Sequence, residues 1–240
     1  MKTPRSWLLL AALAIVAAPA VADARAKHSK AAGKSKAGKR SKSRRATGDN
    51  MPKGFAWPPN ETMRAKGEAC KQALTAANIA FSEATPQKRV PTPIELTSME
   101  IAGVRYVPTF RKPPFTMDCH LALALQQHSE KLFALGVREV RFSRIYGYTK
   151  VRTGGRTKNV LSRHALGMAM DIYAVVDDTG RVAVVATDYK KGDELLLAVE
   201  QTINECHGFR TVLSPKNDRK SHHDHFHIEA AVDFSVKPAS

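Results

Sequence analysis

Ten residues, Ser162 to Asp171, constrain the fold more than any other part of this chain of 240 residues. They read SRHALGMAMD, so a histidine and a carboxylate stand seven positions apart with Gly167 between them. On one continuous strand this odd spacing would place His164 and Asp171 on opposite faces. We therefore expect the chain to turn at Gly167, and Asp171 to begin a strand with its carboxylate directed back toward the turn.

A second polar cluster, Ser221 to His227, lies near the C-terminus and reads SHHDHFH. The two windows together contain five histidines and two aspartates. His225 and His227 are two positions apart, so on a strand both point to the same face. Neutral imidazole and carboxylate are the ligands of zinc sites that keep one position open. We therefore predict that His164, Asp171 and His227 hold one Zn²⁺ ion, with His225 beside it.

Each of these residues also has a purely structural explanation. A single histidine beside apolar residues is more often part of the packing than a ligand, and a His-rich run near a terminus also fits a solvated loop. The conjunction of S-x-H-x-x-G-x-A-x-D with H-x-x-H-x-H about fifty residues later favours the metal site.

The first 24 residues have the pattern of a secretory signal peptide. Lys2 and Arg5 precede the apolar run Trp7 to Ala18, and residues 20–22 form an A-x-A cleavage site. An uncleaved anchor is the alternative, although the apolar run is short for a membrane span. We therefore expect an exported protein in the periplasm or cell envelope, where cysteines are oxidised.

The three cysteines are Cys70, Cys119 and Cys206. They permit one disulfide and one free thiol, and the sequence leaves the pairing open. A cysteine nucleophile is disfavoured, because no cysteine stands near the histidine clusters in the sequence.

Residues 25–60 are expected to form a basic, disordered linker before a domain of residues 61–240. Residues 25–45 contain ten Lys or Arg and no acid, which is more than half of the net charge of +16. Residues 25–50 contain no large apolar side chain, and such a segment cannot offset the entropy lost on ordering. Because the chain is expected to be exported, we predict anionic envelope polymers or membrane head groups as partners of this tail, and nucleic acid is disfavoured. A solvated spacer without a partner is the alternative.

Apolar periodicity predicts helices over Thr62–Phe81, Asp118–Leu135 and Asp193–Cys206. Strands are expected over Val137–Tyr146, Met170–Val176, Arg181–Val185, Phe209–Leu213 and Phe226–Ala230, with one or two short ones inside Ile94–Val107 and a hairpin turn at Asp177–Gly180. Thr149–Asn159 is rich in Gly, Lys and Arg, and is expected to be a mobile loop at the rim of a cleft. Strands and helices without regular alternation indicate an α+β fold, a small antiparallel sheet with flanking helices.

The two histidine segments, SRHALGMAMD at 162–171 and DHFH at 224–227, resemble those of LAS-type zinc peptidases, which include D-Ala-D-Ala carboxypeptidases and murein endopeptidases. More closely, the chain resembles the bacterial extensin-like C-terminal domain family. This match runs from about Cys70 to Ile228 and includes the helix around Cys119 and the segment Phe209–Pro215. The resemblance implies an LAS/hedgehog-type zinc peptidase-like fold, with zinc ligands at His164, Asp171 and His227.

The resemblance also implies roles for residues around the metal. His225 and Asp224 match positions that assist catalysis in related enzymes, and His222 matches a histidine near the metal in some murein endopeptidases. Asp224 is one methylene shorter than the Glu found in relatives, so His225 ranks above it as the proton carrier.

Three further residues, Ser162, Arg144 and Arg152, are the expected substrate-binding residues. The family often carries a Tyr-Ser-Cys-Arg run before the first box, whereas this chain has YTKV at 148–151. The substitution removes a cysteine and an arginine suited to hold a substrate carboxylate, and Arg152 is the nearest replacement.

These inferences predict zinc-dependent hydrolysis of amide bonds in peptidoglycan stem peptides or cross-links, by a carboxypeptidase or an endopeptidase. D,D and L,D bonds remain alternatives, and the oligomeric state is open. A zinc-containing binding module without catalysis is the second hypothesis. An envelope structural protein that acts through its basic tail is the third.

Overall fold

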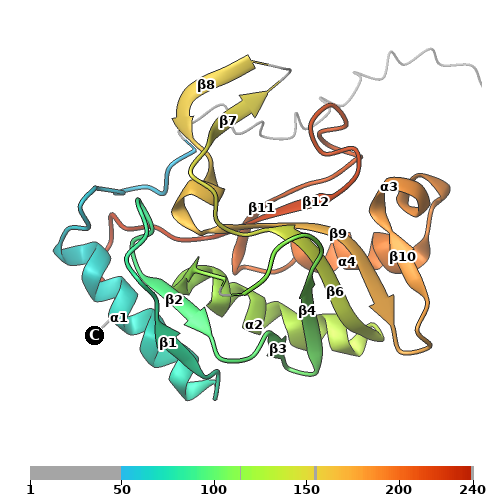
Figure 1. The fold of residues 1–240 in the computed structure, drawn as a ribbon, viewed down its shortest axis with the longest axis horizontal. Coiled ribbons are helices and arrows are strands. Elements are labelled where there is room, and N and C mark those ends of the chain that lie inside the picture. The colour runs from blue at the N-terminus through green and yellow to red at the C-terminus, as the bar shows by residue number, and fades with distance from the viewer. Residues whose placement is uncertain (1–49, 114, 154–155, 239–240) are drawn as a thin grey trace, which may run out of the picture. The chain divides into compact units, whose positions relative to one another are not determined.

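The computed structural model describes residues 50–113, 115–153 and 156–238 (Figure 1). The expected signal peptide and residues 25–49 of the expected linker lie outside these ranges. Residues 50–60, which the sequence placed in the linker, lie against the domain: Pro52 is buried, and the Lys53 carbonyl accepts a hydrogen bond from Phe234 N at 2.8 Å. The described domain therefore starts before the expected residue 61.

Within the described ranges the chain combines helices with three sheets, in agreement with an α+β fold. The helical elements are α1 (Glu61–Ala76), α2 (Cys119–Ala134), η1 (Arg163–Leu166), α3 (Val185–Asp188), η2 (Tyr189–Lys191) and α4 (Glu194–Asn204). The strands are β1 (Phe81–Glu83), β2 (Pro93–Leu96), β3 (Glu100–Ile101), β4 (Val104–Pro108), β5 (Met117–Asp118), β6 (Val137–Arg144), β7 (Lys150–Thr153), β8 (Arg156–Leu161), β9 (Ala169–Asp177), β10 (Val182–Val184), β11 (Phe209–Leu213) and β12 (Phe226–Ala230).

The main sheet has seven strands in the order β11-β12-β9-β6-β4-β3, with β10 paired to β9. Two smaller sheets are β1-β2-β5 and β7-β8. The expected purely antiparallel sheet is wrong in one respect, since β4 and β6 are parallel. Parallel neighbours need a crossover connection, and α2 lies in the segment that joins these two strands.

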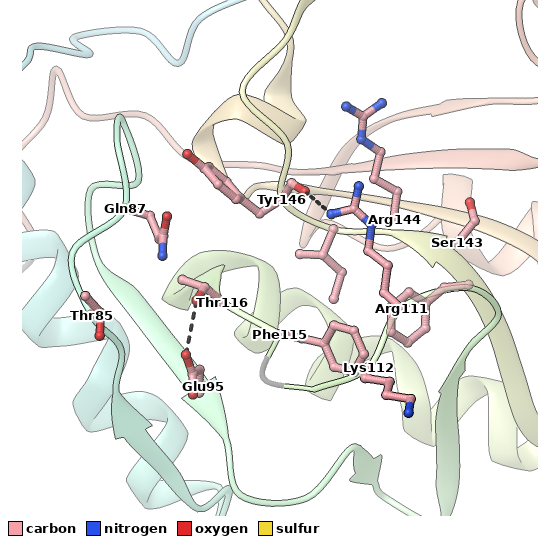
Figure 2. Close-up of a pocket in the computed structure, with 12 residues that line it drawn as sticks. Thr85, Gln87, Glu95, Arg111, Lys112, Phe115, Thr116, Ser143, Arg144 and Tyr146 are labelled. Carbon is pink, nitrogen blue, oxygen red and sulfur yellow. Dashed lines mark hydrogen bonds between the residues drawn. The ribbon is translucent and has the colours of Figure 1, made fainter.

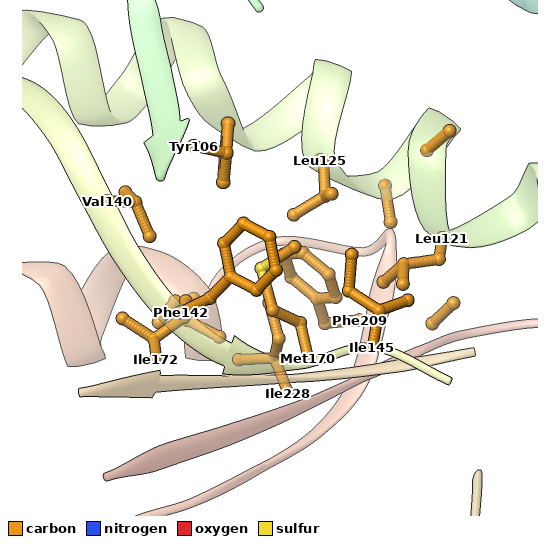
Figure 3. Close-up of a cluster of buried hydrophobic side chains, with 14 of the residues drawn as sticks. Tyr106, Leu121, Leu125, Val140, Phe142, Ile145, Met170, Ile172, Phe209 and Ile228 are labelled. Atoms are coloured by element: carbon orange, nitrogen blue, oxygen red, sulfur yellow. The ribbon is translucent and has the colours of Figure 1, made fainter. Parts of the chain in front are cut away.

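One face of the main sheet packs on α2 and forms the core. Figure 3 shows Leu121 and Leu125 of α2 directed at Phe142, Met170 and Ile228 of three neighbouring strands. The alternate residues of these strands therefore point to the opposite face, which carries the polar side chains. The pairing of β6 with β9 is irregular between Phe142 and Arg144, near the end of β6.

A disulfide between Cys70 and Cys119 links α1 to the start of α2, and Cys206 is a buried free thiol. The two helices run beside each other in Figure 1. This settles the pairing that the sequence left open.

Two expected elements differ from the structure. The first helix ends at Ala76 rather than Phe81, because Asn78 adopts a positive φ of 57° and Phe81 begins β1. The expected mobile loop of residues 149–159 contains the hairpin β7-β8, whose strands pair Lys150 with Leu161 and Thr153 with Arg156. Across the described ranges, no helix has the length and apolarity needed to cross a bilayer.

Candidate metal centre

A short helical turn, η1, presents the first histidine. The Ser162 hydroxyl accepts a hydrogen bond from the backbone N–H of His164 at 3.3 Å and thereby caps the turn. Gly167 ends it with a φ of 67°, as the sequence predicted. A side chain at this position would also meet the backbone nitrogen of Asp118 at 2.8 Å. The glycine therefore lets the chain reverse and bring His164 over the strand that carries Asp171.

Strand pairing supplies the other two members of the cluster. β9 begins at Ala169, one residue before the expected strand Met170–Val176, and Asp171 pairs with His227 of β12 on one side and Arg144 of β6 on the other. Directly paired residues share a face of the sheet. His227, Asp171 and Arg144 thus form a row across three strands, on the face opposite to the core.

The predicted ligands His164, Asp171 and His227 converge. His164 Nε2 lies 3.0 Å from Asp171 Oδ1, His227 Nδ1 lies 2.8 Å from the same oxygen, and the two nitrogens are 3.2 Å apart. Both histidines are buried, with 4% and 6% of their surface exposed. Among the described residues these three form a group of donors that could hold a metal ion.

The outer nitrogen of each histidine has its own partner. His164 Nδ1 donates to the Ile145 carbonyl at 2.7 Å, and His227 Nε2 donates to Glu229 Oε1 at 3.0 Å. Such partners fix the tautomer and leave the inner nitrogen as the ligand atom. The inner atoms, His164 Nε2 and His227 Nδ1, are the two that face Asp171.

An ion-pair network supports the buried Glu229. Arg210 Nε donates to Glu229 Oε2 at 2.7 Å, and Arg210 Nη2 donates to Asn50 Oδ1 at 2.8 Å. The buried Arg163 donates to the Asn50 carbonyl and adds a positive charge near Glu229. Glu229 is not among the residues predicted from the sequence, although its position two residues after His227 on one strand places both on the same face.

The electrostatics of the cluster favour a bound positive charge. Burial opposes ionisation of Asp171, but the charges and hydrogen bonds of His164 and His227 hold its pKa below the ordinary value. Burial lowers the pKa of His164. Burial would also lower the pKa of His227, but its bonds to Asp171 and Glu229 raise it to about 9. With two carboxylates against two imidazoles, the cluster favours added positive charge, either as protons on the rings or as a metal cation between them.

The predicted catalytic residues lie beside the cluster. β12 begins after His225, at Phe226, yet His225 Nε2 is 3.6 Å from Asp171 Oδ1. His222 packs against both His225 and His227, with ring centroids 4.9 and 5.3 Å apart, and Asp218 anchors its Nδ1 at 3.1 Å. Asp224, half exposed, accepts a hydrogen bond from His225 Nδ1 at 2.7 Å.

The expected substrate-binding residues are placed differently from one another. Arg144 lies in the row with Asp171, as described above. Ser162 has its hydroxyl engaged in capping η1. Arg152 is exposed on β7 of the separate hairpin, where it pairs with Thr157 and belongs to neither the cluster nor the row.

Comparisons with known proteins give one result at the level of family. No curated protein and no solved structure matches the chain. The family described as "Extensin-like protein C-terminus" matches residues 68–237, which include the whole His164–Asp171–His227 cluster and both of its histidine segments. The chain therefore belongs to the extensin-like C-terminal family.

Proposed function

We propose that this protein is a zinc-dependent hydrolase of amide bonds in peptidoglycan stem peptides or cross-links. The observation that carries the proposal is the His164–Asp171–His227 cluster, with the outer nitrogen of each ring already engaged. Zinc ligands at about 2.0 Å in a tetrahedron stand about 3.3 Å apart. The three donor atoms, at 2.8 to 3.2 Å, are close to that spacing.

The donor set also suits zinc more than it suits calcium or magnesium. Two imidazole nitrogens and one carboxylate oxygen are typical of zinc, whereas calcium and magnesium prefer oxygen ligands alone. Three protein ligands leave one position for water or substrate. The resemblance of both histidine segments to LAS-type zinc peptidases supports the same assignment.

Zinc, when bound, supplies Lewis acidity that polarises a scissile carbonyl and lowers the pKa of water. The surrounding side chains supply the proton transfers. His225 lies next to Asp171 but is not one of the three proposed ligands. Asp224 accepts a hydrogen bond from Nδ1 of His225 and so orients the ring. Its Nε2 is therefore placed to accept a proton and pass it to the leaving amine. His222, whose Nδ1 is hydrogen-bonded to Asp218, is the neighbouring ring on the His225 side of the cluster.

The substrate class follows from compartment and charge. The expected signal peptide indicates export, and stem peptides are the most abundant amide substrates of a bacterial envelope. Arg144 shares the face of Asp171 and has no ion pair with it among the described contacts, so its guanidinium is suited to bind a peptide carboxylate.

The test uses the zinc-loaded protein and purified muropeptides, with products identified by mass spectrometry. We expect His164→Ala and His227→Ala to lose stoichiometric zinc. His225→Ala should keep zinc and lose about 10²–10⁴-fold in turnover. His223→Ala is the matched control, because His223 stands in the same run but is largely exposed.

The outcomes discriminate between the hypotheses. Full zinc occupancy in both His164→Ala and His227→Ala would show that the ligand assignment is wrong. Zinc loss in His225→Ala would make His225 a ligand and the site a closed, structural one. A protein that binds zinc but cleaves no muropeptide would favour the non-catalytic binding module. The masses of the products identify the bond cut.

A further inference from the structure

A cavity of about 570 Å³ opens next to the candidate metal centre. It lies between the end of β6, strand β2 and the loop that contains Arg111 and Phe115 (Figure 2). Ile145, whose carbonyl holds His164, and Arg144, which pairs with Asp171, both line it. A group bound in this cavity would therefore sit adjacent to the cluster.

The two sides of the cavity carry opposite polarity. Figure 2 shows Arg111, Lys112 and Arg144 on one side, and Glu95 with the amide of Gln87 on the other. Phe115, packed edge-on against Phe142 at 5.4 Å between ring centroids, gives an apolar surface between them. The cavity is thus built for a ligand that carries both charges and some methylene groups.

The cationic side has hydrogen-bonding capacity to spare. Arg144 Nε is buried without a partner among the described residues, and Arg144 Nη2 reaches Thr149 only at 3.3 Å. Arg111 Nη1 makes a long contact of 3.4 Å with the Tyr146 carbonyl. A buried guanidinium N–H without an acceptor is costly, and a carboxylate accepts from two such groups at once.

The acidic side has one carboxylate. Glu95 Oε1 accepts the Thr116 hydroxyl at 3.1 Å, and as a carboxylate it has lone pairs left for an ammonium group. Glu95 disfavours a ligand that is only anionic, such as a phosphate, because like charges repel. The three cations disfavour a simple amine for the same reason.

We propose that this cavity is a subsite for a zwitterionic amino-acid ligand that presents a carboxylate and an ammonium at opposite ends of a short aliphatic chain, because the cations and Glu95 lie on opposite sides. Arg111 and Arg144 bind the carboxylate, and Glu95 binds the ammonium. The placement beside the cluster makes this the side-chain subsite for the hydrolysed peptide. That last role rests on the proposed function, whereas binding of the group itself does not.

The experiment measures binding of small probes to the full protein after removal of metal by a chelator, by amide NMR titration. The probe is meso-diaminopimelate, which carries an ammonium and a carboxylate at each end and can therefore present a carboxylate to the arginines and the ammonium of its other end to Glu95. Pimelate, with carboxylates alone, and cadaverine, with ammonium groups alone, are matched in length. We expect meso-diaminopimelate to shift the amides of Phe115 and Thr116 and to bind about tenfold more tightly than either analogue.

Two variants test the two charges separately. Arg111→Gln should weaken binding of meso-diaminopimelate by about tenfold or more. Glu95→Gln should abolish the preference over pimelate. Lys190→Gln and Glu130→Gln, which make the same charge changes at exposed positions away from the cavity, should bind as the wild type does.

Three results would overturn the proposal: no shift at the cavity amides, equal affinity of the wild type for meso-diaminopimelate and pimelate, or Arg111→Gln and Glu95→Gln variants that behave as the controls do. The muropeptide assay separates this proposal from the function. Zwitterion binding without cleavage refutes hydrolysis and keeps the subsite. Cleavage without zwitterion binding refutes the subsite alone.

Discussion

Removal of the Cys70–Cys119 disulfide should destabilise the domain by an amount that follows from its loop length. The bond joins residues 49 positions apart. Closing a loop of that size removes entropy from the unfolded chain worth about 4 kcal/mol at 25 °C. In a domain of this size each kcal/mol shifts Tm by about 2–4 °C, so Tm should fall by about 8–16 °C.

The assay is urea unfolding and thermal melting of the Cys70→Ala/Cys119→Ala variant against the wild type. Wild-type protein reduced with a phosphine provides the same comparison without changing a side chain. Cys206→Ser, with the disulfide intact, controls for loss of the free thiol. A loss below about 1 kcal/mol in both the variant and the reduced protein would refute the entropic reasoning, because the unfolded chain would then gain little freedom.

Three further predictions concern other parts of the molecule. Burial lowers the pKa of His128 to about 4, below the ordinary value of about 6.5, so the unfolded state binds more protons between these values. The free energy of unfolding should be full above pH 6.5 and fall by about 3 kcal/mol as pH drops to 4. Urea unfolding over this pH range should show no such fall for His128→Leu, and an equal fall in variant and wild type would contradict the prediction. Glu229→Gln should weaken zinc binding by about 10–100-fold in a chelator competition, with Glu130→Gln as the control, because His227 loses a charged partner; equal affinity would exclude that support. Deletion of residues 25–49 should leave cleavage of soluble muropeptides intact and weaken binding to whole sacculi at low salt, and equal sacculus binding would refute a role for the basic tail.

The sequence could place His164 near Asp171 because the turn between them follows local rules, whereas His227 joins them through the pairing of β12 with β9. The positive φ of Gly167 is a property of the turn, and strand parity places successive even or odd residues on one face. His164 and Asp171 therefore had to meet if the chain turned at the glycine, and they do.

The partners of the cluster depend on which strands become neighbours, and no local pattern encodes that. Arg144 enters the row only because β6 pairs with β9, and Arg210 reaches Glu229 only because β11 pairs with β12. The hairpin β7-β8 was missed because its composition, rich in Lys and Arg, is also that of a loop. The parallel pair β4-β6 was missed because the short strands before α2 gave no sign of a crossover.

The contacts of Asn50 have a consequence for how the protein is shortened. This residue is the first one that the structure describes, and its side chain and carbonyl accept hydrogen bonds from Arg210 and Arg163, behind His227. A chain cut at the start of α1 would lose these acceptors and leave two guanidinium groups without them. Any loss of zinc binding or activity in such a chain could come from the weakened hydrogen bonds behind His227 as well as from the missing tail. A deletion that tests the tail alone therefore has to stop at residue 49.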